Sequence, residues 1–217
     1  MLQRRGRGRA SPSQTSNASR AARGHTDGAT DAAVASLAEK GYANTTTRGI
    51  AARAGVTPGA LQHHFPTKTE LMAEARRHIS TKIVHEIMSQ GELAELPHLE
   101  RAEQLLDRMW RLYSGALLQA GMELWVAART DAQLRAKLVD VQRFGGEWLA
   151  AAGQILFPEV ADRQAISGLI ATADATLRGL AVLRCVNDAD AERAWPAARA
   201  HLLALGAPVR AGTGAQS

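Results

Sequence analysis

Residues 46–65 read Thr46-Thr47-Arg48-Gly49-Ile50-Ala51-Ala52-Arg53-Ala54-Gly55-Val56-Thr57-Pro58-Gly59-Ala60-Leu61-Gln62-His63-His64-Phe65. This stretch predicts two short helices joined by a tight turn. Gly55 can adopt the left-handed conformation that closes a helix, Thr57 offers an N-cap oxygen, and Pro58 falls at the first helical position. The apolar residues can share one small core while the polar side of the second helix faces outward. This layout is typical of a helix-turn-helix, whose second helix enters the DNA major groove.

The pattern extends on both sides of the motif. It comprises Gly41-Tyr42, Thr45-Thr46, Ile50-Ala51, Ala54-Gly55-Val56, Gly59, Leu61, His64-Phe65, Lys68 and Leu71. Over about residues 26–80, this run resembles the N-terminal domain of the TetR family of transcriptional regulators. The resemblance implies a DNA-binding head followed by a helical domain that usually binds a small molecule and dimerises.

Two positions depart from the family pattern. Gln62 stands where the family usually has a tyrosine that touches a phosphate, so operator affinity or choice is expected to differ. Gly49 stands where the family usually has an acid. It removes the acidic half of a capping box begun by Thr46 and weakens the helix by about 1 kcal/mol relative to alanine.

Side chains at the starts of the two short helices are the candidates for DNA contact. The set is Thr46, Thr47, Arg48, Thr57, Pro58, Gly59, Gln62, His63, His64 and Lys68. The first three can meet a phosphate through hydroxyls and free backbone N–H groups. Gln62 and His63 are the expected base readers, because a glutamine amide can pair bidentately with adenine. By the resemblance, His64 and Lys68 contact phosphates, although His64 could instead pack beside Phe65.

The positive charge of the chain is concentrated at its N-terminus. The formal net charge is +5, but the first 25 residues carry six arginines and no acid, which leaves −1 for the rest. The pI of about 10.0 therefore describes this arm and not the folded part. Residues 1–25 are rich in Arg, Gly and Ser and are predicted to form a disordered basic arm. The arm either adds salt-dependent affinity for DNA or only keeps the protein in solution.

The remaining sequence predicts an all-α protein, because apolar residues recur at helical spacing and no alternating strand pattern is present. Helices are expected over about residues 27–40, 68–90, 100–119, 122–149, 162–185 and 189–205. The first ends at Gly41, and the second starts with the capping box from Thr67 to Glu70. The predicted domains are a helix-turn-helix domain over about 26–80, a helical ligand-binding and dimerisation domain over about 81–210, and a disordered tail at 211–217.

Bulky side chains gather in the second half, where all four tryptophans lie. Such residues either fill a core or line a ligand cavity. The predicted ligand-binding set, for an apolar or aromatic small molecule, is Met109, Trp110, Tyr113, Met122, Trp125, Phe144 and Trp148. The predicted interface of a homodimer is formed by Ala173, Leu177, Leu180, Trp195 and Leu202, although a monomer could bury the same residues internally.

Several classes of function are excluded on the sequence. No cofactor is expected, because neither a phosphate-cradling glycine-rich loop nor a nucleophile-elbow motif is present. No paired histidine spacing suits a metal, a single cysteine forms no disulfide framework, and no apolar run approaches 18 residues. We therefore expect a cytoplasmic, ligand-responsive repressor on a pseudo-palindromic operator. The alternatives are control by a protein partner without a ligand, and a helical enzyme or scaffold that does not bind DNA.

Overall fold

The computed structural model describes the backbone of residues 12–88 and 92–211 and the side chains of 26–88 and 93–207. These residues fold into helices without a strand, which confirms the all-α prediction. The helices are α1 (Pro12–Asn44), α2 (Thr47–Ala54), α3 (Pro58–His64), α4 (Lys68–Met88), α5 (Glu92–Glu95), α6 (His98–Tyr113), α7 (Ala116–Ala128), α8 (Ala132–Leu156), α9 (Arg163–Arg184) and α10 (Asp188–Ala211).

The N-terminal helix is longer than the sequence predicts. The backbone of residues 12–25 continues α1, so the prediction of a disordered arm is wrong for these residues; residues 1–11 lie outside the described part, as do 212–217 of the predicted tail. The predicted end of the helix is confirmed, since Gly41 interrupts the helical backbone with φ 72° and ψ 171°. This positive φ favours glycine, and an added Cβ would lie 2.9 Å from Glu123 Oε2, so the Glu123 carboxylate would also have to move.

The helix boundaries in the C-terminal half differ most from the prediction. The helices expected over about 100–119 and 122–149 are three helices, α6, α7 and α8. The first break follows Tyr113, at Ser114-Gly115. The second precedes Ala132, where Asp131 Oδ1 caps α8 by accepting from the Leu134 N–H at 2.9 Å. Apolar spacing continues through both breaks, so periodicity alone could not find them.

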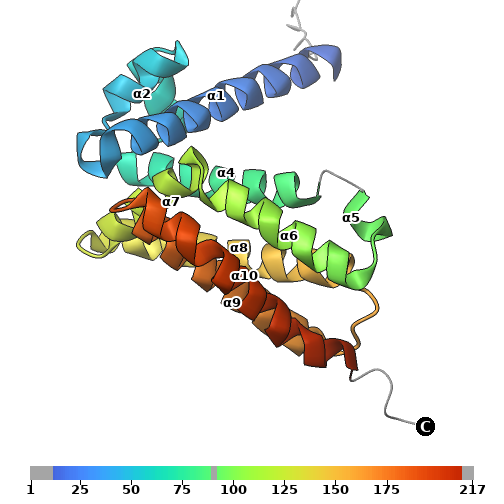
Figure 1. Cartoon of the computed structure of the whole chain (residues 1–217). Helices are drawn as coiled ribbons and strands as arrows, with labels where there is room; N and C mark the ends of the chain where they lie inside the picture. Colours follow the sequence, from blue (N-terminus) through green and yellow to red (C-terminus); the bar gives the residue numbers. More distant parts are fainter. Residues whose placement is uncertain (1–11, 89–91, 212–217) are drawn as a thin grey trace, which may run out of the picture.

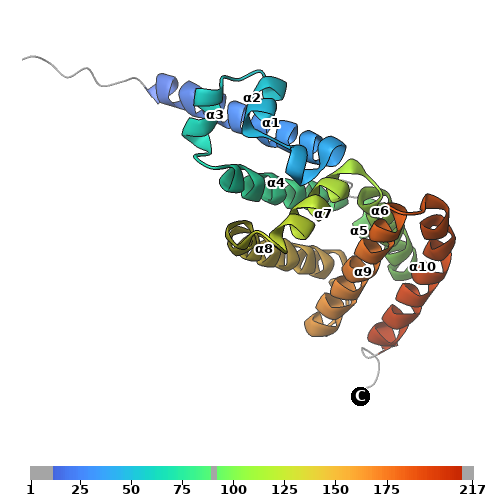
Figure 2. The same cartoon turned by 90° about the vertical axis from the view of Figure 1, so that its left-hand side faces the viewer.

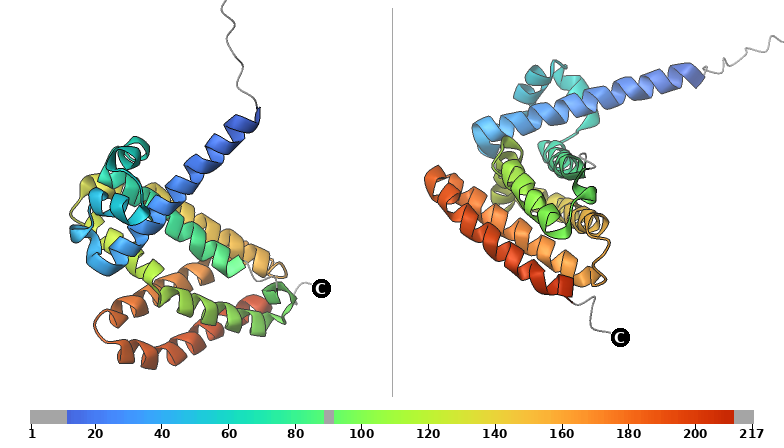
Figure 3. Two further views of the ribbon diagram at one scale, coloured as in Figure 1. Left: turned by 90° about the horizontal axis from the view of Figure 1, so that it is seen from above. Right: turned by 45° about the vertical axis from the view of Figure 1, so that its right-hand side comes forward.

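A head and a body can be distinguished in the arrangement of the helices. Helices α1, α2 and α3 form the head, which rests on α4 and α7 (Figure 1). Helices α9 and α10 run side by side on the opposite side of the body (Figures 2 and 3). Helix α4 belongs to both parts, because it starts directly after α3 and packs along α8.

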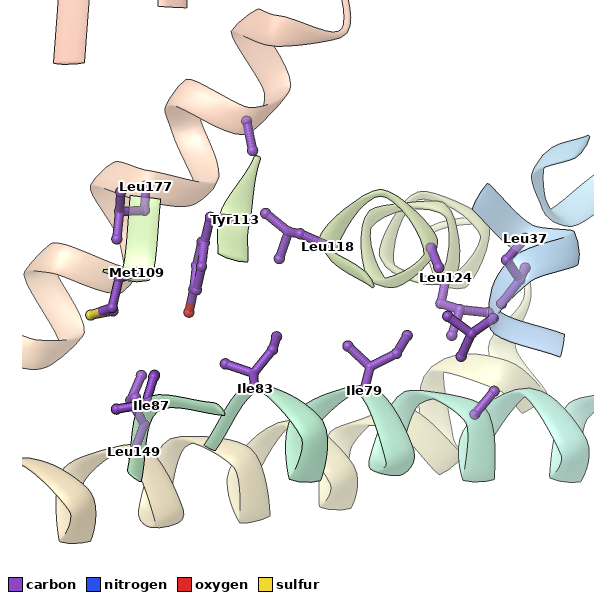
Figure 4. Close-up of a cluster of buried hydrophobic side chains, with 14 of the residues drawn as sticks. Leu37, Ile79, Ile83, Ile87, Met109, Tyr113, Leu118, Leu124, Leu149 and Leu177 are labelled. Carbon is purple, nitrogen blue, oxygen red and sulfur yellow. The ribbon is translucent and has the colours of Figure 1, made fainter. Parts of the chain in front are cut away.

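The core of the body is built on one face of α4. Ile79, Ile83 and Ile87 are buried there at a spacing of four residues and point toward Tyr113 of α6 and Leu118 of α7 (Figure 4). The core of the head is thinner and contains several alanines, among them Ala29 and Ala33. The head therefore depends on few large side chains, chiefly Leu37, Ile50, Leu61, Phe65 and Leu71.

Candidate functional site

The helix-turn-helix is defined by local hydrogen bonds that the sequence predicts. Thr46 Oγ1 accepts from the Gly49 N–H at 3.1 Å and caps α2, while Thr57 Oγ1 accepts from the Ala60 N–H at 3.1 Å and caps α3. Gly55 closes α2 in the left-handed conformation, with φ 67° and ψ 25°. Each of these residues satisfies backbone groups that the helix ends would otherwise leave open. The tight turn is therefore a property of its own residues.

Helix α3 presents almost all of its side chains to solvent. Leu61 is its one buried residue, while Thr57, Pro58, Gly59, Gln62, His63 and His64 are all exposed. No atom lies within 4 Å of a Cβ built on Gly59, so this turn of the helix can approach a partner closely. Thr46, Thr47 and Arg48 at the start of α2 are exposed as well. The structure thus leaves nine of the ten predicted DNA-contacting side chains accessible.

Lys68, the tenth candidate, is half-buried. Its Nζ donates to the Tyr42 carbonyl oxygen at 2.9 Å and lies 4.1 Å from the centre of the Tyr42 ring. Burial lowers the pKa of Lys68, and the charge of Asp131 partly opposes this shift. The ammonium group ties the start of α4 to the end of α1, a structural role that the sequence does not reveal. Its implied phosphate contact stays a prediction.

A second set of contacts at Tyr42 joins the head to the body. Glu123 Oε2 of α7 accepts from the Tyr42 backbone N–H at 2.9 Å, and the Tyr42 hydroxyl lies 3.3 Å from Asp131 Oδ2. Both acids follow Tyr42 by more than 80 residues, so no local sequence signal could have paired them. Burial, followed by the charge of Asp131, raises the pKa of the Tyr42 hydroxyl. The head is therefore hydrogen-bonded to α7 through Glu123 and to the start of α8 through Asp131.

The predicted ligand-binding side chains do not share one cavity. Met109 lines an apolar cavity of about 280 Å³ between α6, α9 and α10, and no lining residue of that cavity belongs to α1, α4 or α7. Trp110 stacks on Trp195 with ring centres 5.0 Å apart and an interplanar angle of 8°. This stacking packs α6 onto α10, and a ligand contact of Trp110 stays a prediction. Met122 is half-buried and lines none of the described cavities.

Phe144 and Trp148 lie on the outer side of the body. They line an apolar surface hollow of about 390 Å³ between α4 and α8, together with Val84, His85 and Met88 among others. Phe144 is 37% exposed and Trp148 is 51% exposed. These two rings therefore do not face Tyr113 and Trp125, which lie on the inner side of α8.

Tyr113 and Trp125 line a small cavity of about 40 Å³ between α4, α6, α7, α8 and α9. Two arginines flank the indole ring of Trp125, with the Cζ of Arg76 at 4.9 Å and that of Arg178 at 4.3 Å from the ring centre. Arg178 binds Asp174 through two nitrogens, and the Tyr113 hydroxyl donates to the same carboxylate. We call these five residues the arginine cluster. Sequence reasoning found its aromatic members but missed its charged ones.

Burial shifts the ionisation of the cluster. It lowers the pKa of Arg76 to about 10, with a further contribution from the neighbouring charge of Arg178. Burial, together with Asp174, raises the pKa of Tyr113. At neutral pH, Arg76 therefore stays charged and Tyr113 stays a hydrogen-bond donor. A charged guanidinium in the interior is costly unless an opposite charge compensates it.

The residues predicted for the dimer interface lie in or against the protomer's own core. Ala173, Leu177, Trp195 and Leu202 are at most 8% exposed, and Leu180 is half-buried against the same core. They fill the protomer's own interior and are not available to a partner. The outer face of α9 is nevertheless apolar: an 18-residue window has a mean hydropathy of 1.4, and only 28% of it is buried. The exposed residues of this face include Ala171, Ala175, Gly179 and Val182, and Val186 just beyond the end of the helix is exposed as well.

By length and hydropathy alone, α9 could cross a membrane. One such helix is weak evidence, because core helices of proteins that do not enter membranes pass the same test. Helix α9 packs on α6, α8 and α10 and carries the Asp174–Arg178 pair in its middle. It is thus one layer of the helical body.

Comparisons with known proteins agree with this architecture. Residues 29–75 match the model of the bacterial regulatory proteins of the tetR family. The chain is 32% identical over 168 residues to the HTH-type transcriptional regulator CymR of Pseudomonas putida, covering 75% of this chain and 79% of that protein. This likeness extends well beyond the helix-turn-helix.

Solved structures show the same fold. A TetR-family regulator from Mesorhizobium loti superposes with a TM-score of 0.68 at 21% identity, over 86% of this chain and 96% of that one. The multidrug binding protein EbrR complexed with ethidium superposes with a TM-score of 0.59 at 24% identity, over 83% and 98%. Together with the resemblance to CymR, these matches exclude the alternative of a helical enzyme. The chain is a transcriptional regulator that belongs to the TetR family.

Proposed function

We propose that this regulator is a homodimeric repressor that binds a pseudo-palindromic operator and releases it when a small molecule enters the body. The observation that carries the proposal is the course of α4. Three residues separate this single helix from the end of α3, and further along it lines the cavity of the arginine cluster with Arg76, Ser80 and Ile83. A change at the cavity therefore has a direct mechanical route to the DNA-binding head.

The head has a second connection to the same cavity. Gly121 and Trp125 of α7 line the cavity, and Glu123, which lies between them in the sequence, accepts from the Tyr42 N–H. A ligand that separates α7 from α4 would thus shift the head against the body. Only a ligand with different affinities for the two arrangements can move the equilibrium between them. The larger cavity lined by Met109 lacks such contacts, so we assign the effector to the arginine cluster.

On the DNA side, the exposed face of α3 is suited to the major groove. Gln62 and His63 are the proposed base readers, with phosphate contacts from the starts of α2 and α3 and from Lys68. A dimer would place two α3 helices about 34–36 Å apart, one turn of the duplex. The proposed domains are a DNA-binding domain over about 26–80 and a ligand-binding and dimerisation domain over about 81–210. Helix α4 crosses position 80 without a break and so belongs to both. As a regulator of transcription, the protein would act in the cytoplasm.

The proposed dimer uses the outer face of α9. Small residues on this face allow helices of two protomers to approach closely, and a two-fold axis would pack the face against itself. A substitution of Val182, which is 55% exposed, by arginine tests this surface. We expect V182R to shift the protein from dimer to monomer in sedimentation analysis while its circular dichroism stays that of the native fold. A V182R protein that remains a dimer would overturn the assignment.

Among proteins of this fold, EbrR has been crystallised with ethidium and with imidazole. This supports the general point that the fold can bind small organic molecules. It does not indicate the ligand of this chain, because the two sequences are only 24% identical.

The experiment that tests the function is fluorescence anisotropy of the full chain on DNA from upstream of its own gene, with scrambled DNA beside it, across a salt series. We expect tight, selective binding that persists at physiological salt. Equal binding to both DNAs that disappears as salt rises would indicate only non-specific attraction between arginines and phosphates. In that case the role of α3 as a recognition helix would be rejected.

A further inference from the structure

Arg76 is the most unusual residue of the interior. It is 5% exposed, and among the described residues its guanidinium donates to neutral oxygens. Its Nη1 donates to Ser80 Oγ at 2.5 Å, and its Nη2 lies 3.4 Å from Gln142 Oε1. Among the described residues, its Nε has no hydrogen-bond partner. Buried donors are rarely left open in folded proteins, so such a group calls for a physical reason.

The charges around the cavity do not balance. Its lining residues include three charged side chains, of which Arg76 and Arg178 are positive and Asp174 is negative, so they sum to one net positive charge. Asp174 is already bound by two nitrogens of Arg178, at 3.0 and 2.7 Å, and by the Tyr113 hydroxyl. It is the one carboxylate among the described residues that line the cavity. Among the described residues that line the cavity, no second carboxylate is therefore present to compensate the charge of Arg76.

The open Nε has space beside it. A Cβ built on Gly121 of α7 would lie 4.0 Å from this nitrogen, so glycine leaves the approach to Nε free. Apolar side chains complete the walls, among them Ile83, Leu118 and Leu149 (Figure 4 shows their position between α4, α7 and α8). The cavity thus combines apolar walls with a few polar groups, among them the open charged donor of Arg76, which is the composition of a ligand site.

We propose that the effector of this regulator is a small organic monocarboxylate, whose carboxylate binds Arg76 and whose compact apolar body packs against Ile83, Leu118 and Leu149. The inference rests on the proposed function, since it names the class of ligand for that same cavity. A guanidinium matches a carboxylate in charge and geometry, with parallel N–H donors that can bind both oxygens. The ligand would supply the missing charge and satisfy the open donor.

The size of the cavity links binding to regulation. A volume of about 40 Å³ exceeds the roughly 10–15 Å³ that one water needs, so it can hold a carboxylate group but not a complete aromatic acid. The body of the ligand would therefore have to separate α4, α7 and α8. Because the complete ligand fits only when these helices have moved apart, its binding favours the expanded arrangement of the body. Helices α4 and α7 then transmit the expansion to the head.

Matched pairs of probes test the ligand class. We would titrate the full chain with benzoate and with benzamide, and with cyclohexanecarboxylate and its primary amide, following thermal unfolding and tryptophan fluorescence. Each pair shares its shape and differs in charge. We expect both acids to raise the unfolding temperature in a saturable way and the amides to have little effect. Equal effects of acid and amide, or no effect of either acid, would overturn the proposal.

Three variants locate the effect. R76M removes the charge at similar length and should weaken carboxylate binding about thirtyfold or more, as expected when one half of a buried charge pair is lost. R77M is the matched control, because Arg77 is the exposed neighbour on the same helix; its binding should equal that of the native chain. Equal carboxylate affinity in R76M and R77M would overturn the proposal.

Gly121→Ala gives an answer even if R76M fails to fold. The new methyl group would lie at ordinary contact distance from Arg76 Nε, so the fold can accept it. It occupies the approach to the nitrogen while every charge stays in place. We expect G121A to unfold at a higher temperature than the native chain, as alanine favours a helix over glycine, and to bind benzoate more weakly. Unchanged benzoate binding in G121A would contradict the proposed position.

These measurements need no DNA, so the two proposals can fail separately. If the chain binds carboxylates but does not select its own upstream DNA, the regulatory function fails and the ligand class stands. If it selects DNA but responds only to neutral probes, the regulatory function stands and the carboxylate is rejected.

Discussion

The head and the body of this regulator place their functional side chains in opposite ways. In the head, α3 exposes its candidate DNA-contacting residues and holds itself in place by Leu61 alone, with caps formed by adjacent residues. In the body, the arginine cluster is assembled from four helices, with Arg76 and Tyr113 buried and the other members half-buried. Recognition of a large, charged duplex needs an accessible surface, whereas recognition of a small molecule needs an enclosed one. Local sequence signals therefore describe the DNA-binding surface, which is built from neighbouring residues, and not the arginine cluster, which is built from distant ones.

The largest effect is expected from a cavity in the body. Leu177 of α9 is fully buried, so Leu177→Ala should lower the free energy of unfolding by about 2–5 kcal/mol. Leu205→Ala on α10 is the control; Leu205 is 54% exposed, and its removal should change stability by less than about 0.5 kcal/mol. Urea denaturation followed by circular dichroism measures both. Equal losses would mean that Leu177 does not belong to the protomer core.

In the head, the largest effects should fall on DNA selectivity. Gln62→Ala and His63→Ala remove exposed side chains, so they should leave stability nearly unchanged and cost about 1–3 kcal/mol of discrimination at the base pair that each one reads. Anisotropy with operator variants measures the discrimination. A uniform loss across all DNA sequences would instead assign these residues to the phosphates.

Lys68 lies where the head meets the body, and its two possible roles give different results. Lys68→Met keeps the apolar stem and removes the contact with the Tyr42 carbonyl oxygen. If the ammonium also meets a phosphate, affinity should fall equally on all sequences, and the slope of log affinity against log salt should shrink by about 1. An unchanged slope would leave Lys68 with the structural role alone.

The caps of the head should contribute moderately to stability. Thr57→Ala removes the oxygen that accepts from the Ala60 N–H, which should cost about 1 kcal/mol. Thr57→Ser is the control, because serine retains the accepting oxygen. Thermal unfolding of the two variants measures the difference. If T57A is as stable as T57S, the cap does not stabilise α3.

The smallest effect concerns the contact between α1 and α4. Burial would raise the pKa of Asp31, but hydrogen bonds from Lys82 and His78 and their positive charges outweigh it, so the pKa lies below its ordinary value of 3.8. The ionised form therefore stabilises the fold above pH 3.8, and this contribution disappears as the pH falls through the lowered pKa.

Asp31→Asn should flatten the acid limb of the stability curve, and the urea midpoint between about pH 6 and pH 3 measures it. The loss should be modest, because the carboxylate is half-exposed and water screens the pair. A variant curve parallel to that of the native chain would show that the pair does not contribute.

The helix-turn-helix follows from the local sequence, because its turn and caps are hydrogen bonds between residues a few positions apart. These bonds join Thr46 to Gly49, Gly55 to Ala51, and Thr57 to Ala60. The all-α class followed from apolar spacing, and the family from the run of residue types around Gly41 and Lys68. Three features depend on the tertiary structure and could not be predicted. They are the arginine cluster, the Tyr42–Glu123 contact and the outward face of α9.

The physical reason is separation along the chain. Arg76 and Asp174 lie almost one hundred residues apart, and nothing in their own neighbourhoods distinguishes them from surface charges. The same spacing that marks Leu177 as apolar fits a core and an interface equally well. Only the packing of α9 on α6, α8 and α10 shows that Leu177 points inward and Val182 points out.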